Sequence, residues 1–125
     1  MLTFTVEGQP VPKGRPRFAN HAYTPKRTRA YETLVRAAAL EALGVFGSPW
    51  ELGGKMGVRL WFYRKGGKKD PGKELHRCDL DNLVKAVTDA LNGVLYADDQ
   101  QIDVIEAYRE VDSEKPRVTV AVRHL

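Results

Sequence analysis

The chain has 125 residues, of which 42% are hydrophobic and 29% are charged. A chain of this length is typical of a single domain with one modest core, so we expect residues 1–125 to form one domain. No apolar run approaches the roughly 20 residues of a membrane-spanning helix. The start of the chain lacks the basic and apolar segments of a signal peptide, and the single cysteine, Cys78, excludes an internal disulfide. These features favour a cytoplasmic protein with no membrane contact.

The charges are distributed unevenly along the chain. The formal net charge is +4, and residues 1–77 contain 15 of the 20 Lys and Arg but only 6 of the 16 Asp and Glu. Residues 78–110 show the reverse, with eight acids against Lys85 and Arg109. A basic surface beside an acidic site is typical of a protein that binds a polyanion and carries out metal chemistry on it. Chance clustering in a small protein is the alternative.

The first half of the chain predicts a strand, a helix and a second strand. Apolar residues alternate with polar ones from residue 2 to 7, which indicates a half-buried strand. Residues 8–18 contain three prolines and two glycines, so no regular structure is expected there. Residues 28–43 predict a helix that ends at Gly44. Its expected apolar face is Tyr31, Leu34, Val35 and Ala38.

The second half predicts a further strand, a helix and two last strands. Apolar residues alternate from residue 58 to 62, and a Gly/Lys loop follows. The next helix carries an apolar stripe and ends at Asn92-Gly93. The stripe consists of Leu80, Leu83, Val84, Val87 and Leu91. Residues 103–111 and 116–123 indicate two strands joined by a hairpin-like turn. The prediction is an α+β fold with a small mixed β-sheet, helices packed on it and the order β-α-β-α-β-β.

Acidic residues are concentrated around the second helix. Asp81, Lys85 and Asp89 are spaced at i, i+4 and i+8, so they share the helix face opposite the leucines. Asp79 can converge with Asp81 only if it lies before the helix, at the N-cap, because two residues within a helix diverge by about 200°. A purely structural role for these residues, as cap, dipole partner and salt bridge, is an equal alternative on this stretch alone.

A second acidic pair, Asp98 and Asp99, follows this helix. If the chain returns along the helix, three or four carboxylates would meet near the helix start and would repel one another without a cation. Oxygen ligands of this kind suit Mg²⁺, for which Mn²⁺ can substitute. Such an ion activates water and stabilises the charge that develops on a phosphate during cleavage, and Lys85 could reach the same phosphate. In the alternative, Asp98-Asp99 is an exposed turn.

Two basic segments are candidates for contacts with a nucleic-acid backbone. Residues 11–29 contain six cations and no acid, with Phe18 and Tyr23 interleaved, and residues 64–73 are a second Lys-rich loop. Each segment alone is more often a solvated surface, but two in one small domain favour phosphate binding. The predicted DNA-binding residues are Lys13, Arg15, Arg17, Lys26, Arg27, Arg29, Lys68, Lys69 and Arg77.

The segment "DLDNLVKAVTDAL" followed by "YADDQQI" resembles the signature of the RusA family of Holliday-junction resolvases of bacteria and phages. The segments "PVPKGRPRF" and "YTPKRTRAYE" resemble the N-terminal region of phage-type members. The resemblance implies a homodimeric, Mg²⁺-dependent endonuclease, bacterial or phage-encoded, that nicks four-way DNA junctions in recombination and repair. It implies no organic cofactor.

Carried over residue by residue, the resemblance implies that Asp79, Asp81 and Asp99 are the essential carboxylates and that Lys85 is the functional lysine. Asp98 matches the neighbouring acid, so the direct metal ligand in this pair is either Asp98 or Asp99. Two other functions stay open: a non-catalytic DNA-binding module, because basic loops bind DNA without metal, and a nuclease for other branched DNA with the same site.

Overall fold

The computed structural model describes residues 1–14, 17–18, 22–23, 25–66 and 78–125, with the backbone alone at 17–18 and 22–23. The main elements follow the predicted order β-α-β-α-β-β. They are β1 (Leu2–Glu7), α1 (Lys26–Val45), β4 (Met56–Arg64), α3 (Leu80–Ala90), β5 (Ile102–Val111) and β6 (Arg117–His124). A two-stranded ladder of β2 (Arg17–Phe18) and β3 (Ala22–Tyr23) precedes α1, and the 3₁₀ helix η1 (Asp99–Gln101) precedes β5.

The main sheet is mixed, as predicted, and has the strand order β1-β6-β4-β5. β6 runs antiparallel to both β1 and β4, whereas β4 and β5 are parallel. The prediction of a hairpin-like turn between the last two strands is wrong, because β4 lies between β5 and β6. The parallel pairing of β4 and β5 requires a crossover, and α3 is part of it.

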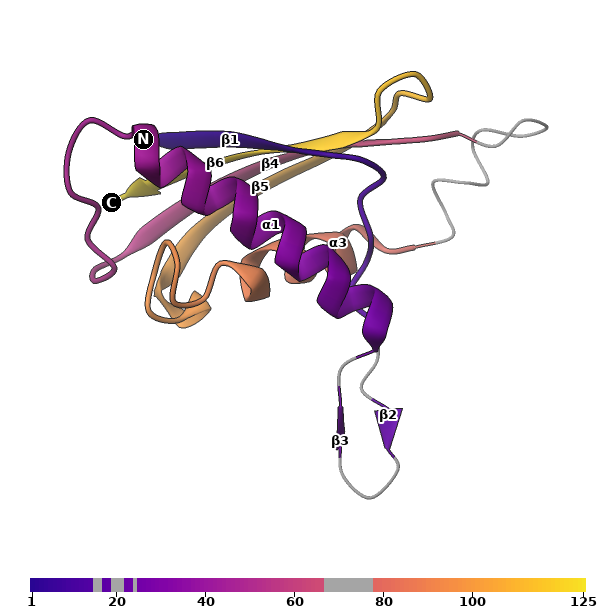
Figure 1. Ribbon diagram of the computed structural model, residues 1–125, viewed down its shortest axis with the longest axis horizontal. Helices are drawn as coiled ribbons and strands as arrows, with labels where there is room; N and C mark the ends of the chain where they lie inside the picture. The colour runs from indigo at the N-terminus through magenta and orange to yellow at the C-terminus, as the bar shows by residue number, and fades with distance from the viewer. Residues whose placement is uncertain (15–16, 19–21, 24, 67–77) are drawn as a thin grey trace.

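Both helices pack on one face of the sheet, and the core lies between the two layers (Figure 1). Strand alternation creates this core, since every second residue of β1 is buried and the residues between are exposed. The largest fully buried side chains include Phe62 and Leu60 of β4, Leu83 and Val87 of α3, and Tyr96 of the following connector. This core therefore fixes one side of α3 against the sheet.

Helix α1 is two residues longer at each end than predicted. Gly44 lies inside it, and the helix ends at Val45, so the predicted cap at Gly44 is wrong. Tyr31 and Val35 of the predicted face are buried and Ala38 packs against the core, but Leu34 is 55% exposed, and Ala39 is buried as well. Neither α1 nor any other helix in the described part of the chain is long and apolar enough to cross a membrane.

Helix α3 begins directly after Asp79 and is capped at its other end by Leu91, close to the predicted bounds. Gly93 follows with a φ of 76°, a conformation that glycine adopts without a steric penalty. The carboxyl end of α3 is also held by α1, since Arg36 Nε donates a hydrogen bond to the Ala90 carbonyl at 2.9 Å. A cation at this end is favourable for the helix dipole. These contacts set the position of α3 relative to α1.

Candidate active site

A groove runs along α3, between this helix and β5. Its volume is about 470 Å³, and it is lined by Leu80, Asp81, Val84, Lys85, Thr88, Asp99, Ile105 and Ala107. Three of the predicted functional residues, Asp81, Lys85 and Asp99, therefore share one groove. Its apolar wall is formed by the outer side of α3 and by β5, where Ile105 is 49% exposed.

Asp79 and Asp81 occupy the start of α3 as the sequence predicts. Asp79 is the N-cap residue, with extended backbone (φ −81°, ψ 145°) and no side-chain capping hydrogen bond, and Asp81 lies in the first turn. Arg109 of β5 fixes the approach to this turn, because its Nη1 donates a hydrogen bond to the Cys78 carbonyl at 2.7 Å. The Asp79 side chain is thus exposed and committed to no cap, which leaves it available to a ligand.

The two neighbouring acids after α3 have different roles in the structure. Asp98 is the N-cap of η1: its side chain accepts a hydrogen bond from the Gln100 backbone at 2.9 Å, and its own backbone N–H donates to Gln101 Oε1 at 2.9 Å. The bond from Gln100, followed by that with Asp99, holds the pKa of the Asp98 carboxyl below its usual value. Asp98 therefore stabilises the connector, and Asp99 lines the groove.

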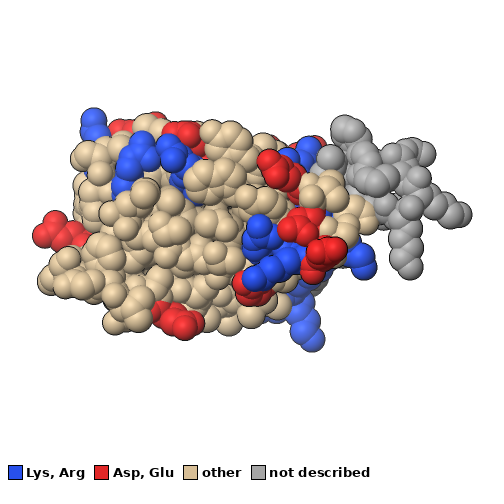
Figure 2. Space-filling view, turned by 90° about the horizontal axis from the view of Figure 1, so that it is seen from above, with Lys and Arg blue, Asp and Glu red and all other residues tan. Residues whose placement is uncertain are grey.

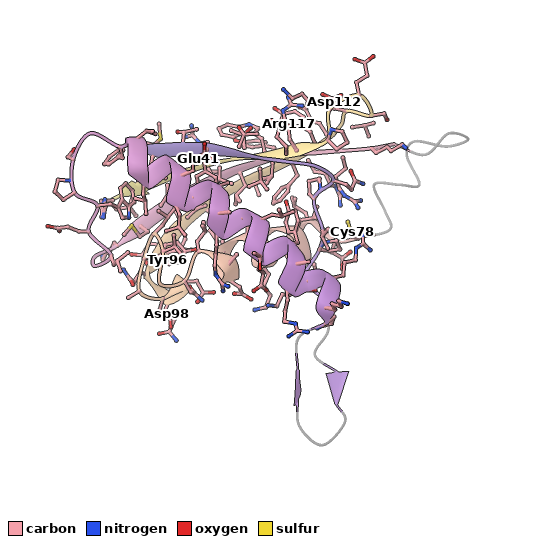
Figure 3. All side chains as sticks on the ribbon, viewed as in Figure 1. Glu41, Cys78, Tyr96, Asp98, Asp112 and Arg117 are labelled. Carbon is pink, nitrogen blue, oxygen red and sulfur yellow. The ribbon has the colours of Figure 1, made fainter. Side chains whose placement is uncertain are left out.

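The connector holds Asp99 against α3. Tyr96, which lies in this connector two residues before Asp98 (both are labelled in Figure 3), is fully buried and donates a hydrogen bond from its hydroxyl to the Thr88 carbonyl at 2.6 Å. Burial raises the pKa of the Asp99 carboxyl, and so do its hydrogen bonds and charge interactions with Asp98 and Asp89. Proximity of like charges disfavours the ionised form, and a cation at this point would reverse that effect.

The structure brings Asp99 together with Asp89, near the carboxyl end of α3, rather than with Asp79 and Asp81 at its start. Among the residues that the structure describes, no three His, Cys, Asp or Glu side chains gather closely enough to hold a metal ion by themselves. Mg²⁺ commonly binds through one or two carboxylates and completes its shell with water and substrate phosphate. Either of the two groove carboxylates, Asp81 or Asp99, therefore fits this smaller donor set.

Lys85 lies between Asp81 and Asp89 on one face of α3. Its side chain is 60% exposed, and its Nζ is 3.9 Å from Asp89 Oδ2, so the ammonium is only weakly engaged. A long, exposed lysine in the groove can move toward an anionic substrate at little energetic cost.

The predicted DNA-binding cations fall into three groups. Lys26, Arg27 and Arg29 are exposed in the first turn of α1, a position where the helix dipole disfavours positive charge. For a second group the structure describes no side chain: Arg17 is described by its backbone alone, and four others lie outside the described residues, namely Arg15, Lys68, Lys69 and Arg77. Lys13 differs from the others, because its side chain is only 18% exposed and faces acids.

The segment before α1 holds the first turns of the two helices together. The Gly14 backbone donates to Thr28 Oγ1 at 3.0 Å, and the Lys13 backbone donates to the Asn82 carbonyl at 2.9 Å, so one short segment joins the first turns of α1 and α3. Figure 2 shows the molecule from above: on the face in view, Lys and Arg side chains stand beside Asp and Glu side chains toward the end with the grey residues, and the middle of that face carries few charges. The cations of α1 thereby lie on the side of the molecule where α3 begins.

Two residues of this region were not identified from the sequence. Glu32 of α1 is largely buried and accepts a hydrogen bond from Lys13 Nζ at 2.7 Å, and Arg109 supports the start of α3. An acid on the otherwise apolar face of α1, one residue after Tyr31, was the available signal for Glu32. No local pattern marks Arg109, because its partner is 31 residues away in the chain.

An α+β domain with two carboxylates and a lysine along one groove has the composition of a nuclease site. The family model of endodeoxyribonuclease RusA matches residues 7–123. The chain also resembles the uncharacterized protein YqaN of Bacillus subtilis (strain 168), with 30% identity over 142 aligned positions that cover 99% of this chain and 96% of the relative. The chain belongs to the RusA family of endodeoxyribonucleases.

Proposed function

We propose that this protein resolves four-way (Holliday) DNA junctions by divalent-metal-dependent hydrolysis, nicking two strands symmetrically in DNA recombination and repair. The observation that carries the proposal is the shared groove: Asp81 from the first turn of α3, Lys85 one turn later and Asp99 from the connector line the same open surface. Membership of an endodeoxyribonuclease family supports the reaction class.

Asp81 and Asp99 are the groups that would hold Mg²⁺ or Mn²⁺, with Asp79 at the N-cap as the third candidate. Such an ion supplies a Lewis acid for the phosphate and lowers the pKa of bound water. Lys85 provides a positive charge within the groove for a non-bridging phosphate oxygen. Asp98 is the weaker candidate, because its carboxylate already accepts the capping hydrogen bond of η1.

The cations at the start of α1 would contact the DNA backbone. Three positive charges in a first helical turn disfavour the helix, so their presence is explained better by a polyanionic partner than by folding. Such contacts hold the DNA and carry little sequence information by themselves. Sequence preference at the junction would depend on other groups.

Cleavage of a synthetic four-way junction is the direct test. Purified protein with Mg²⁺ should produce paired nicks in strands of like polarity, and Asp81→Asn should lower the rate by at least about 100-fold, since loss of a group that supports a metal ligand already costs 10–100-fold. Binding of the junction by the variant, measured in Ca²⁺, should be retained. Intact junctions with the wild-type protein, despite tight binding, would overturn the proposal in favour of a non-catalytic DNA-binding module.

A flap and a plain duplex in the same assay identify the substrate class. Equal cleavage of flap and junction would replace junction resolution by a broader branched-DNA nuclease activity with the same site.

A homodimer is part of this proposal, because a four-way junction has two-fold symmetry and paired nicks need two sites related by it. Light scattering coupled to size-exclusion chromatography should therefore give about twice the chain mass of 14.0 kDa. A monomer that remains monomeric on junction DNA would exclude symmetric nicking by one assembly.

A further inference from the structure

Lys13 makes three contacts with two helices at once. Its Nζ lies 2.7 Å from Glu32 Oε1 of α1 and 3.4 Å from Asp89 Oδ2 of α3. Its backbone N–H donates to the Asn82 carbonyl in the first turn of α3 at 2.9 Å. Main chain and side chain are therefore both fixed, and the side chains of Lys13, Glu32 and Asp89 are only 18%, 12% and 20% exposed.

Asp89 is the acid that this contact controls. Its carboxyl group adjoins Asp99 and helps to raise the pKa of that residue, yet Asp89 does not line the groove. Two cations face Asp89: Lys13 at 3.4 Å and the more exposed Lys85 at 3.9 Å. The Lys13 pair is shorter and more buried, so it is screened less by solvent and salt.

Glu32 holds the ammonium in place from the other side. Arg36, one turn along α1, is the second cation near Glu32, at 3.9 Å. Burial lowers the pKa of Lys13, but the hydrogen bond and charge of Glu32, together with Asp89, more than offset this, and the pKa lies above its ordinary value. The Lys13 ammonium is therefore charged at neutral pH and lies between the carboxylates of Glu32 and Asp89.

We propose that Lys13 is a positioning residue of the candidate active site: its ammonium, anchored by Glu32, holds Asp89 beside α1 and so leaves Asp99 as the carboxylate that faces the groove. The inference rests on the proposed function, because it concerns a metal ligand of that site. It assigns Lys13 a role different from those of the exposed cations of α1. Removing one partner of a largely buried ion pair leaves the other charge uncompensated, so loss of Lys13 leaves Asp89, which already adjoins Asp99, without its closest cation and free to move from its place beside α1.

Metal affinity and catalytic rate distinguish this role from a phosphate contact. A lysine that contacts phosphate affects DNA binding and its salt dependence, whereas a positioning lysine affects the bound metal and kcat. Lys13→Met should weaken Mn²⁺ binding in the absence of DNA by about 10–100-fold and lower kcat by a similar factor, with KM for the junction within about threefold of wild type.

Two further variants complete the experiment. Lys13→Arg retains the charge and should recover Mn²⁺ affinity and kcat to within about fivefold of wild type. Lys55→Met removes an exposed lysine that pairs with Asp103 at 3.7 Å, and it should leave all values unchanged. If Lys13→Met does not fold, as judged by circular dichroism, Glu32→Gln takes its place, because the ammonium then loses its anchor.

Each outcome decides between the possibilities. Wild-type Mn²⁺ affinity and kcat in Lys13→Met, or in Glu32→Gln where it is the variant used, overturn the inference and leave the proposed function intact. A variant that changes only KM and the salt dependence of junction binding also overturns the positioning role, in favour of a contact between Lys13 and phosphate. A wild-type protein that neither binds Mn²⁺ nor cuts a junction overturns the proposed function and this role with it.

Discussion

Asp99→Asn is expected to lower the junction cleavage rate by at least about 100-fold and, in metal-free buffer at pH 7, to raise Tm by roughly 1–4 °C. The rate falls because asparagine is a poor substitute for a carboxylate ligand of Mg²⁺. The Tm rises because the substitution removes a charge that adjoins both Asp89 and Asp98. A substitution that lowers activity but raises stability is characteristic of a functional site whose like charges are left without a cation.

The pH dependence of this gain has a defined sign. The pKa of Asp99 is raised in the folded protein above its ordinary value of 3.8, so protonation favours folding and ionisation opposes it. The advantage of Asp99→Asn over the wild type should therefore be complete above the raised pKa. It should disappear below the ordinary value, where the wild-type side chain is also neutral. Melting curves from pH 3 to pH 8 measure this directly.

Two neighbouring substitutions serve as controls for Asp99→Asn. Asp98→Asn keeps an oxygen acceptor for the cap of η1, so cleavage should fall by less than about tenfold. Asp103→Asn changes an exposed acid outside the groove and should alter neither cleavage nor Tm. A larger loss of cleavage in Asp98→Asn than in Asp99→Asn would make Asp98 the ligand and would contradict the roles assigned to the pair.

The element order was predictable because burial in this fold is periodic. β1, β4 and α3 show clear alternation or an apolar stripe, and each was predicted close to its observed bounds. The separation of β5 from β6 by β4 was not predictable from the turn, because a short connection allows adjacent or non-adjacent antiparallel strands. The order is settled only by the pairing of β4 with β5 on one side and with β6 on the other.

Helix α1 shows the limit of periodicity in a helix of mixed polarity. Leu34 fits the apolar stripe in sequence, but the helix turns a face with Val35 and Ala39 inward and leaves Leu34 exposed. Glu32 is largely buried on that inward side because a long-range partner, Lys13, satisfies it. The apolar pattern therefore located most of the buried face, whereas the burial of Glu32 depends on a distant partner that the local pattern does not show.

Much of the local geometry of the site followed from helix rules alone. The requirement that Asp79 precede the helix for it to lie near Asp81 follows from about 100° of rotation per residue, and its N-cap position is confirmed. The partner of Asp99 was not foreseen. It depends on how tightly the connector returns, which Tyr96 fixes through its bond to Thr88.

Leu83→Ala should be the most destabilising of the substitutions considered, at a cost of about 2–5 kcal/mol and a Tm at least about 6 °C lower. Leu83 is fully buried where α3 packs on the sheet, so truncation leaves a cavity beneath the helix that carries Asp81 and Lys85. Thermal or urea unfolding in the absence of metal measures the effect.

Leu80→Ala is the matched control, since it makes the same change one turn earlier in the same helix. Leu80 is half-buried and lines the groove, so solvent can fill the space and the loss of stability should be less than half that of Leu83→Ala. Equal losses would mean that the apolar stripe packs uniformly, as the sequence pattern alone suggests. Unequal losses would show that Leu83 anchors α3 to the sheet, whereas the side of the helix that carries Leu80 remains open as the wall along which Asp81, Lys85 and Asp99 meet a substrate.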